Sequence, residues 1–175
     1  MIHHSQAIIL IILLVVAVIF DLRERRIPNW LTFPFMAAGV AYHVAANGFP
    51  GLSQSVQGLM MGIALLVLFY LAGGMGAGDV KLMGAVGSIL GPAHVLWAFV
   101  YSALAGGIYS AFVLYRHSVL RSSLKRCVSA PVDFMRTGHW FWSPSPAIKK
   151  IPRMCYAVAI SLGTGIHVLR SLYNG

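Results

Sequence analysis

The chain has 175 residues, of which 58% are hydrophobic and only 10% are charged. A typical soluble domain has about 25% charged residues, so this composition excludes a soluble globular enzyme, a disordered regulator and a coiled coil. The 13 Lys and Arg residues against 4 Asp and Glu residues give a net charge of +9. Because these basic residues interrupt long apolar runs and form no basic face on a polar domain, we predict a membrane protein without a nucleic-acid partner.

Six apolar stretches predict transmembrane helices, since about 20 mainly apolar residues are needed to span a bilayer and only helices satisfy their own backbone in lipid. In chain order the stretches cover residues 7–20, 30–46, 59–72, 80–90, 93–115 and 156–172. We therefore expect an all-α polytopic membrane protein with about six transmembrane helices in a single domain, residues 1–175. The first stretch is interpreted as a retained anchor, because its basic cluster follows the apolar run and no small-x-small cleavage site follows Phe20.

The distribution of basic residues predicts the orientation, because cytoplasmic loops retain Lys and Arg. All of them except Arg170 fall on odd-numbered connections, whereas the second connection, residues 47–57, carries no charge. The odd connections, including the long loop 116–153, are therefore expected to be cytoplasmic, with both termini outside. Within that loop, residues 116–128 have the spacing of a helix on the inner membrane surface or, equally, of a solvated continuation of the fifth helix.

Two of the four acids stand where expected helices meet the same membrane face. Asp21 follows the first helix, which runs inward, and Asp79 stands at the mouth of the fourth, which runs outward. Ionisable groups near the apolar zone are costly, which makes them candidates for function. Two carboxyls held close share one proton, so the ionised one can activate water while the protonated one polarises a peptide carbonyl. This pattern predicts a catalytic pair that titrates as a unit and needs no metal or cofactor.

The neighbours of the two acids admit more than one interpretation. Residues 73–78 read Gly-Gly-Met-Gly-Ala-Gly, which either leaves room for a substrate backbone or serves helix packing. Lys81 either acts on the Asp79 carboxyl and its loop or extends to the membrane surface. Asn29 is expected to cap the second helix. The seven histidines are scattered along the sequence and are not expected to bind a metal.

Three segments carry a resemblance to a known family. Residues 76–82, GAGDVKL, resemble the GxGD signature of intramembrane aspartic proteases in its GxGDxKL form, which is typical of type IV prepilin peptidases. Residues 21–29, DLRERRIPN, resemble the other half of that family's site, and residues 156–163, YAVAISLG, are similar to its YGVAIAxG helix. Cys155 stands where proline is usual and Ala157 where glycine is usual, and both departures are expected to lie away from the aspartates.

The resemblance implies a prepilin or pseudopilin substrate, with a basic leader, a scissile bond after glycine and an apolar helix, cut at the cytoplasmic face of the bacterial inner membrane. The expected catalytic residues are Asp21 and Asp79, and Gly76, Gly78, Lys81 and Asn29 are expected to support the loop or the substrate. Long family members carry paired CxxC motifs associated with N-methylation. This sequence has no CxxC, so it resembles the short form found with tight-adherence (Flp-type) pili, and peptidase activity without a methyltransferase is expected.

Two alternatives from other classes are kept. A small proton- or cation-coupled transporter also uses intramembrane aspartates and broken, Gly-rich helices. The small size, the absence of a visible inverted repeat and the position of both aspartates at one face argue against it. A non-catalytic scaffold subunit of a pilus or secretion machine is the other alternative, but it would not need two aspartates at matched depth. The oligomeric state and the particular prepilin are not predicted.

Overall fold

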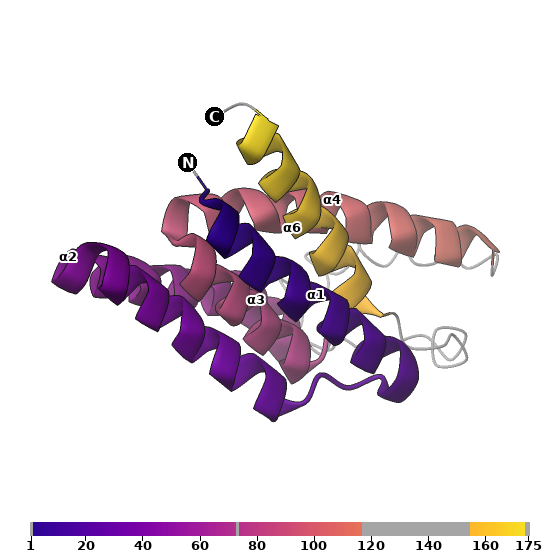
Figure 1. Cartoon of the computed structure of the whole chain (residues 1–175). Helices are drawn as coiled ribbons and strands as arrows, with labels where there is room; N and C mark the ends of the chain where they lie inside the picture. Colours follow the sequence, from indigo (N-terminus) through magenta and orange to yellow (C-terminus); the bar gives the residue numbers. More distant parts are fainter. Residues whose placement is uncertain (1, 73, 117–154, 174–175) are drawn as a thin grey trace, which may run out of the picture. The chain divides into compact units, whose positions relative to one another are not determined.

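The computed structural model describes residues 2–72, 74–116 and 155–173, and within them every regular element is a helix (Figure 1). The helices are α1 (His4–Glu24), α2 (Asn29–Leu71), α3 (Ala77–Leu90), α4 (Pro92–Arg116) and α6 (Tyr156–Tyr173). The all-α prediction is confirmed for this part of the chain. The expected loop 116–153 and its segment 116–128 lie outside the described residues, apart from Arg116.

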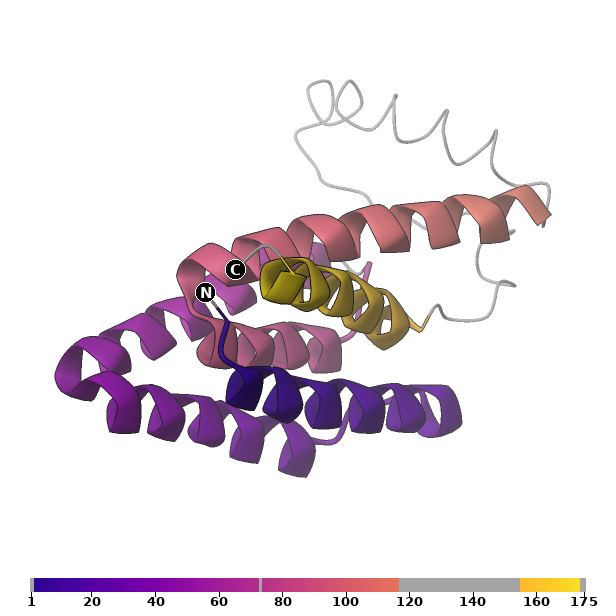
Figure 2. The ribbon, with the colours of Figure 1, turned by 45° about the horizontal axis from the view of Figure 1, so that its top comes forward.

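Contacts divide the chain into two units, of which the first contains Met1–Gly106 and Cys155–Gly175. The second unit is Gly107–Met154, and its described part is the end of α4. All of the candidate site residues belong to the first unit. The start of α1 and the end of α6 lie at the same end of that unit (Figures 1 and 2), an arrangement that an even number of spans requires.

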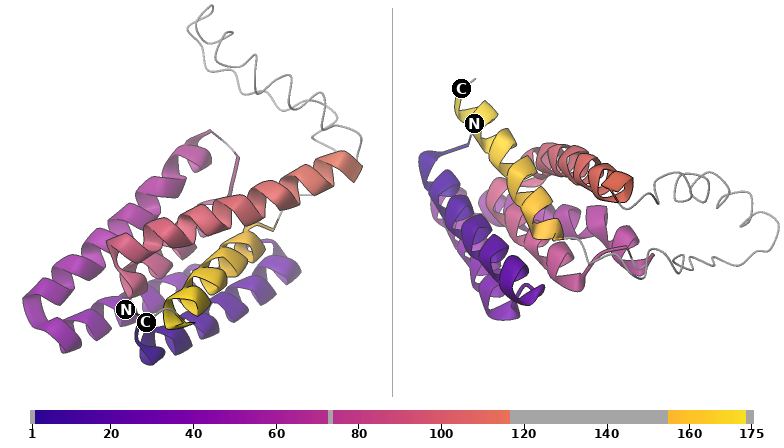
Figure 3. Two further views of the ribbon diagram at one scale, coloured as in Figure 1. Left: turned by 90° about the horizontal axis from the view of Figure 1, so that it is seen from above. Right: turned by 90° about the vertical axis from the view of Figure 1, so that its right-hand side faces the viewer.

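The connection expected at residues 47–57 is wrong, because α2 is helical through this segment except at Gly48. Gly48 has φ 61° and ψ −136°, a left-handed conformation that glycine adopts without steric cost. The helix bends sharply there and the chain reverses direction, so that the two arms form a V (Figure 3). A bend at one residue therefore takes the place of the expected loop between the second and third apolar stretches.

Three helical segments of the described chain are long and apolar enough to cross a membrane: α1, α2 and residues Pro92–Val113 of α4. The bend at Gly48 divides α2 into two arms, which contain the second and the third predicted apolar stretches. With 14 residues, α3 is shorter than the roughly 20 that a full span needs. The count of six spans and the outside location of the termini therefore stay predictions.

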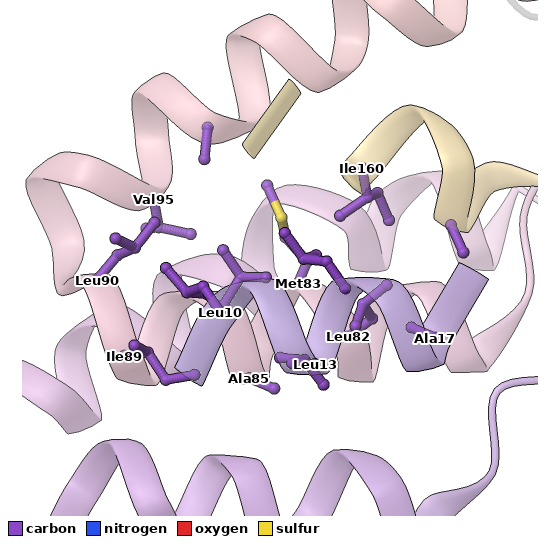
Figure 4. Close-up of a cluster of buried hydrophobic side chains, with 14 of the residues drawn as sticks. Leu10, Leu13, Ala17, Leu82, Met83, Ala85, Ile89, Leu90, Val95 and Ile160 are labelled. Atoms are coloured by element: carbon purple, nitrogen blue, oxygen red, sulfur yellow. The ribbon is translucent and has the colours of Figure 1, made fainter. Parts of the chain in front are cut away.

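The most deeply buried helix is α3, in which every residue from Asp79 to Leu90 except Lys81 is buried. It packs against both arms of α2, against α1 and against α6. Side chains of α1, including Leu10, Leu13 and Ala17, lie along its length (Figure 4). Small residues let membrane helices approach backbone to backbone. Gly87 is such a residue, because a Cβ atom added to it would lie only 2.1 Å from the carbonyl oxygen of Gly58 in the second arm of α2.

Side chains from two neighbouring helices satisfy the carbonyl groups at the end of α3. Ser55 Oγ donates a hydrogen bond to the Ser88 carbonyl at 2.8 Å. The Ile89 carbonyl accepts one from Gln6 Nε2 at 2.9 Å and lies 3.0 Å from His43 Nε2. The last carbonyls of a helix have no intrahelical partner, and leaving them unpaired in an apolar interior is costly. These bonds therefore fix the position of α3 along α1 and α2.

We expect Gly87→Ala to lower the apparent unfolding temperature, because the added methyl group would overlap the Gly58 carbonyl. Overpacking of this kind costs about 1–3 kcal/mol. The measurement is thermal unfolding in detergent micelles. Gly165→Ala in α6 is the matched control, since nothing lies within 4 Å of a Cβ atom there. Equal stability of Gly87→Ala and the wild type would contradict the close packing of α2 on α3.

Candidate active site

Asp21 lies inside the last turn of α1, so the expectation that it follows the helix is wrong by one turn. Its side chain is 7% exposed, and its Oδ2 accepts a hydrogen bond from the backbone N–H of Ala157 at 3.2 Å. Ala157 stands in the first turn of α6, where backbone amides have no partner within their own helix. The first turn of α6 therefore orients the Asp21 carboxyl.

Asp79 lies in the first turn of α3, with its side chain 8% exposed. Its Oδ2 accepts a hydrogen bond from the backbone N–H of Gly76 at 3.1 Å. Gly76 is the N-cap residue and Asp79 the third helical residue, which is the position from which an acidic side chain returns to the cap amide. The positive end of the helix dipole also favours a carboxylate here. The local fold of the Gly-rich segment thus orients the second carboxyl.

The two carboxyls lie at the same end of the packed α1 and α3. Figure 4 shows Ala17, one turn before Asp21, and Leu82, one turn after Asp79, at this end. Asp79 lies outside the three candidate spans. Burial raises its pKa to about 6, the Gly76 amide opposes this shift, and the charge of Asp21 raises the pKa further. The charge of Asp21 therefore acts on the Asp79 carboxyl.

Lys81, two residues after Asp79, forms a link with Asn29. Lys81 Nζ donates a hydrogen bond to Asn29 Oδ1 at 2.8 Å and lies 5.5 Å from the centre of the Phe33 ring. This link joins the start of α3 to the start of α2. Pro28, and not Asn29, is the N-cap residue of α2, so the capping role expected for Asn29 is wrong. Of the roles considered for Lys81, support of the loop is the one with an observed contact.

The site glycines occupy crowded positions. A Cβ atom on Gly78 would lie 3.0 Å from Ile27 Cβ, and one on Gly76 would lie 3.3 Å from Asp79 Oδ2. Gly78 therefore lets α3 pack on the connection between α1 and α2, and Gly76 supplies the amide that holds Asp79. These contacts favour the packing interpretation over open space for a substrate backbone.

The expectation that Cys155 and Ala157 lie away from the aspartates is wrong. Ala157 binds the Asp21 carboxyl, and Cys155 Sγ lies 3.9 Å from the Asp21 backbone carbonyl. Burial raises the pKa of the Cys155 thiol; the charge of Asp21 raises it further, Arg25 opposes the shift, and Asp79 adds a smaller increase. Local sequence patterns do not reveal these contacts, because the partners are more than 130 residues apart. The resemblance of residues 156–163 to a family helix was the available signal.

Among the described residues, no group of three or more His, Cys, Asp or Glu side chains is arranged to hold a metal ion. His94 and His167 form a pair, with 3.1 Å between Nδ1 and Nε2. His43 contacts the Ile89 carbonyl at the end of α3. The groups in contact with Asp21 are the Ala157 amide and the Cys155 thiol.

Asp79 makes the stability of the fold depend on pH. Its pKa is about 6 in the fold against an ordinary value of 3.8, so the folded chain binds the proton more tightly than the unfolded chain. This contribution is fully present below pH 3.8 and is lost as the pH rises through about 6.

We expect the apparent unfolding temperature of the wild type in micelles to fall, relative to that of Asp79→Asn, as the pH rises through this interval. The variant has no proton to lose at this position and keeps an oxygen for the Gly76 amide. Glu24→Gln, which changes an exposed acid, should keep the wild-type slope. Equal slopes in the wild type and Asp79→Asn would contradict the raised pKa.

A family model described as the type IV leader peptidase family matches residues 8–111, which include both acids. The chain is 30% identical to a prepilin leader peptidase/N-methyltransferase of Bacillus subtilis over 60% of this chain and 43% of that protein. Proteins of the same name from Aeromonas salmonicida and Klebsiella pneumoniae are 32% and 35% identical over 59% and 48% of this chain, and 38% and 40% of their own lengths. The matches thus span less than half of these relatives, and no solved structure is significantly similar. Because the family model covers more than half of the sequence, the chain belongs to the type IV leader peptidase family.

Proposed function

We propose that this chain is a membrane-embedded aspartic endopeptidase that removes the basic leader from type IV prepilins or pseudopilins. The observation that carries the proposal is the pair of buried carboxyls, Asp21 and Asp79, at one end of α1 and α3. Membership of the type IV leader peptidase family supports proteolysis. The names of the relatives, which are prepilin leader peptidases, support a prepilin substrate.

The chemistry follows from the shared proton. Two neighbouring carboxyls in a buried site hold one proton between them. The ionised carboxyl takes a proton from water, and the protonated carboxyl polarises the scissile carbonyl as the water oxygen attacks it. Collapse of the resulting tetrahedral intermediate breaks the C–N bond, and the leaving amine takes the proton that the pair removed from water. These steps need neither a metal nor a covalent intermediate.

The position of the acids along their helices suits a leader peptidase. Asp21 follows the apolar run 7–20, and Asp79 precedes the apolar run 80–90, so both belong near a membrane surface, where water is available. The adjacent cluster of Arg23, Arg25 and Arg26 favours the cytoplasmic side of the bacterial inner membrane. A prepilin presents its cleavage site between a basic leader and an apolar helix, at the same depth.

The proposal is limited to peptide cleavage. The N-methyl transfer in the names of the relatives is associated with CxxC motifs, and this sequence contains none. A transporter would require carboxylates along a pathway near mid-membrane, whereas Asp21 lies in the last turn of α1 and Asp79 in the first turn of α3. The peptidase is therefore the function that the site supports best.

We expect Asp21→Asn and Asp79→Asn each to reduce cleavage of a prepilin by at least about 10²-fold, because an amide cannot exchange the proton that general acid–base catalysis requires. Cleavage is measured as conversion of a prepilin to its mature form in membranes that contain each variant. Glu24→Gln is the control, since it changes an exposed acid of the same helix and should cleave normally.

A folded Asp21→Asn or Asp79→Asn protein that cleaves at the wild-type rate would refute the two-aspartate mechanism. Treatment of the wild type with a chelator should leave the rate unchanged. A strong loss with the chelator would instead indicate a metal-dependent reaction.

A further inference from the structure

We propose that the first turn of α6 is a positioning element of the catalytic pair, in which the Ala157 amide and Cys155 hold the Asp21 carboxyl in place. This inference rests on the proposed peptidase function. It adds two residues that belong to neither aspartate motif, and it gives α6 a direct part in the reaction geometry.

The electrostatics of the two helix ends explain why Asp21 needs this support. Asp21 lies at the C-terminal end of α1, where the helix dipole disfavours a negative charge. The first turn of α6 brings the positive end of another helix dipole to the same carboxyl. It also supplies the Ala157 amide, which has no partner within its own helix and donates its hydrogen bond to Asp21. Ala157 is fully buried and Asp21 is 7% exposed, so water has little access to replace this hydrogen bond.

The two carboxyls differ in where their support comes from. Asp79 is held by Gly76, three residues away in its own helix terminus, so that bond forms as α3 forms. The amide that holds Asp21 is 136 residues away along the chain. The orientation of Asp21 therefore depends on how α6 packs on the rest of the first unit.

The packing of α6 on α4 is close enough to fix its first turn. A Cβ atom on Gly163 would lie 2.2 Å from the backbone nitrogen of Ser102, so the two helices meet at their backbones. Ser102 Oγ donates hydrogen bonds to the carbonyls of Ala98, at 2.7 Å, and Ile160, at 3.3 Å. These contacts lie about one to two helical turns from Ala157, so a shift of α6 would move the amide away from Asp21.

Cys155 gives a second contact and an experimental handle. Its Sγ lies against the Asp21 backbone carbonyl at 3.9 Å, and the residue is half-buried, so a small thiol reagent can reach it. The added bulk would stand between the start of α6 and the end of α1. Modification of Cys155 should therefore separate the Ala157 amide from the Asp21 carboxyl.

The sharpest test replaces the Ala157 backbone amide by an ester, through incorporation of lactic acid, which removes the N–H and keeps the methyl side chain. The matched control is the corresponding ester at Val158, which changes the next amide of the same turn and leaves the Ala157 N–H in place. Both proteins are assayed for prepilin cleavage across pH in membranes, with kcat and KM determined separately.

We expect the Ala157 ester to lower kcat by about tenfold or more, since a misplaced catalytic group reduces the rate steeply, with little change in KM. The acidic limb of its pH profile should move to higher pH, because the ionised carboxyl has lost a hydrogen bond that stabilised it. The Val158 ester should keep the wild-type profile. A purely structural defect would lower the amount of active enzyme without moving the profile.

The thiol experiment decides the matter if the Ala157 ester does not fold. In a Cys127→Ser background, methyl methanethiosulfonate converts the Cys155 thiol to a methyl disulfide and releases methanesulfinate. Labelling of Cys155 should slow cleavage and move the acidic limb of the pH profile to higher pH, as expected for the Ala157 ester. The Cys155→Ser variant is the control, and its rate should be the same with and without the reagent. An unchanged rate after complete labelling of Cys155, or a wild-type kcat and pH profile in the Ala157 ester, would overturn the proposal.

The aspartate variants distinguish a failure of the peptidase mechanism from a failure of the role proposed for α6. If Asp21→Asn and Asp79→Asn cleave normally, the peptidase mechanism itself is wrong. If both are inactive while the Ala157 ester behaves as the wild type does, the mechanism stands and the role of α6 is wrong.

Discussion

The arrangement depends on one physical constraint: polar groups at the ends of helices that are buried in an apolar interior must find partners. At the C-terminal end of α3, Ser55, Gln6 and His43 meet the free carbonyls. At its N-terminal end, Asp79 accepts the hydrogen bond of the Gly76 amide. The same requirement at the start of α6 is met by Asp21. Satisfying helix termini thus orients both carboxyls.

Close helix packing makes this orientation durable. Gly58 and Gly87 bring α2 and α3 together at their backbones, and Gly163 does the same for α6 and α4. Packing of this kind replaces the hydrophobic driving force that is absent between helices in lipid. The burial that results raises the pKa of Asp79, which favours a shared proton. The glycines of the fold and the acids of the site are therefore parts of one arrangement.

The sequence predicts the elements of this structure better than their contacts. Apolar runs are enough to find α1, α3, α4 and α6 within a few residues. The bend in α2 is missed because the Asn, Gly, Pro and Ser residues near Gly48 are typical of a loop. In the structure these residues are helical on both sides of Gly48, which alone has a left-handed conformation. The contact of Ala157 with Asp21 is missed because it joins distant parts of the chain, and hydrophobic periodicity carries no information on such pairs.

The central claim is that one proton shared by Asp21 and Asp79 drives cleavage. The pH dependence of kcat for the wild-type enzyme, with a prepilin in reconstituted membranes, tests it most directly. A pair that acts in its singly protonated form predicts a bell-shaped profile, with activity lost when both carboxyls are protonated and when both are ionised. A rate that stays constant from acidic to alkaline pH would contradict the account.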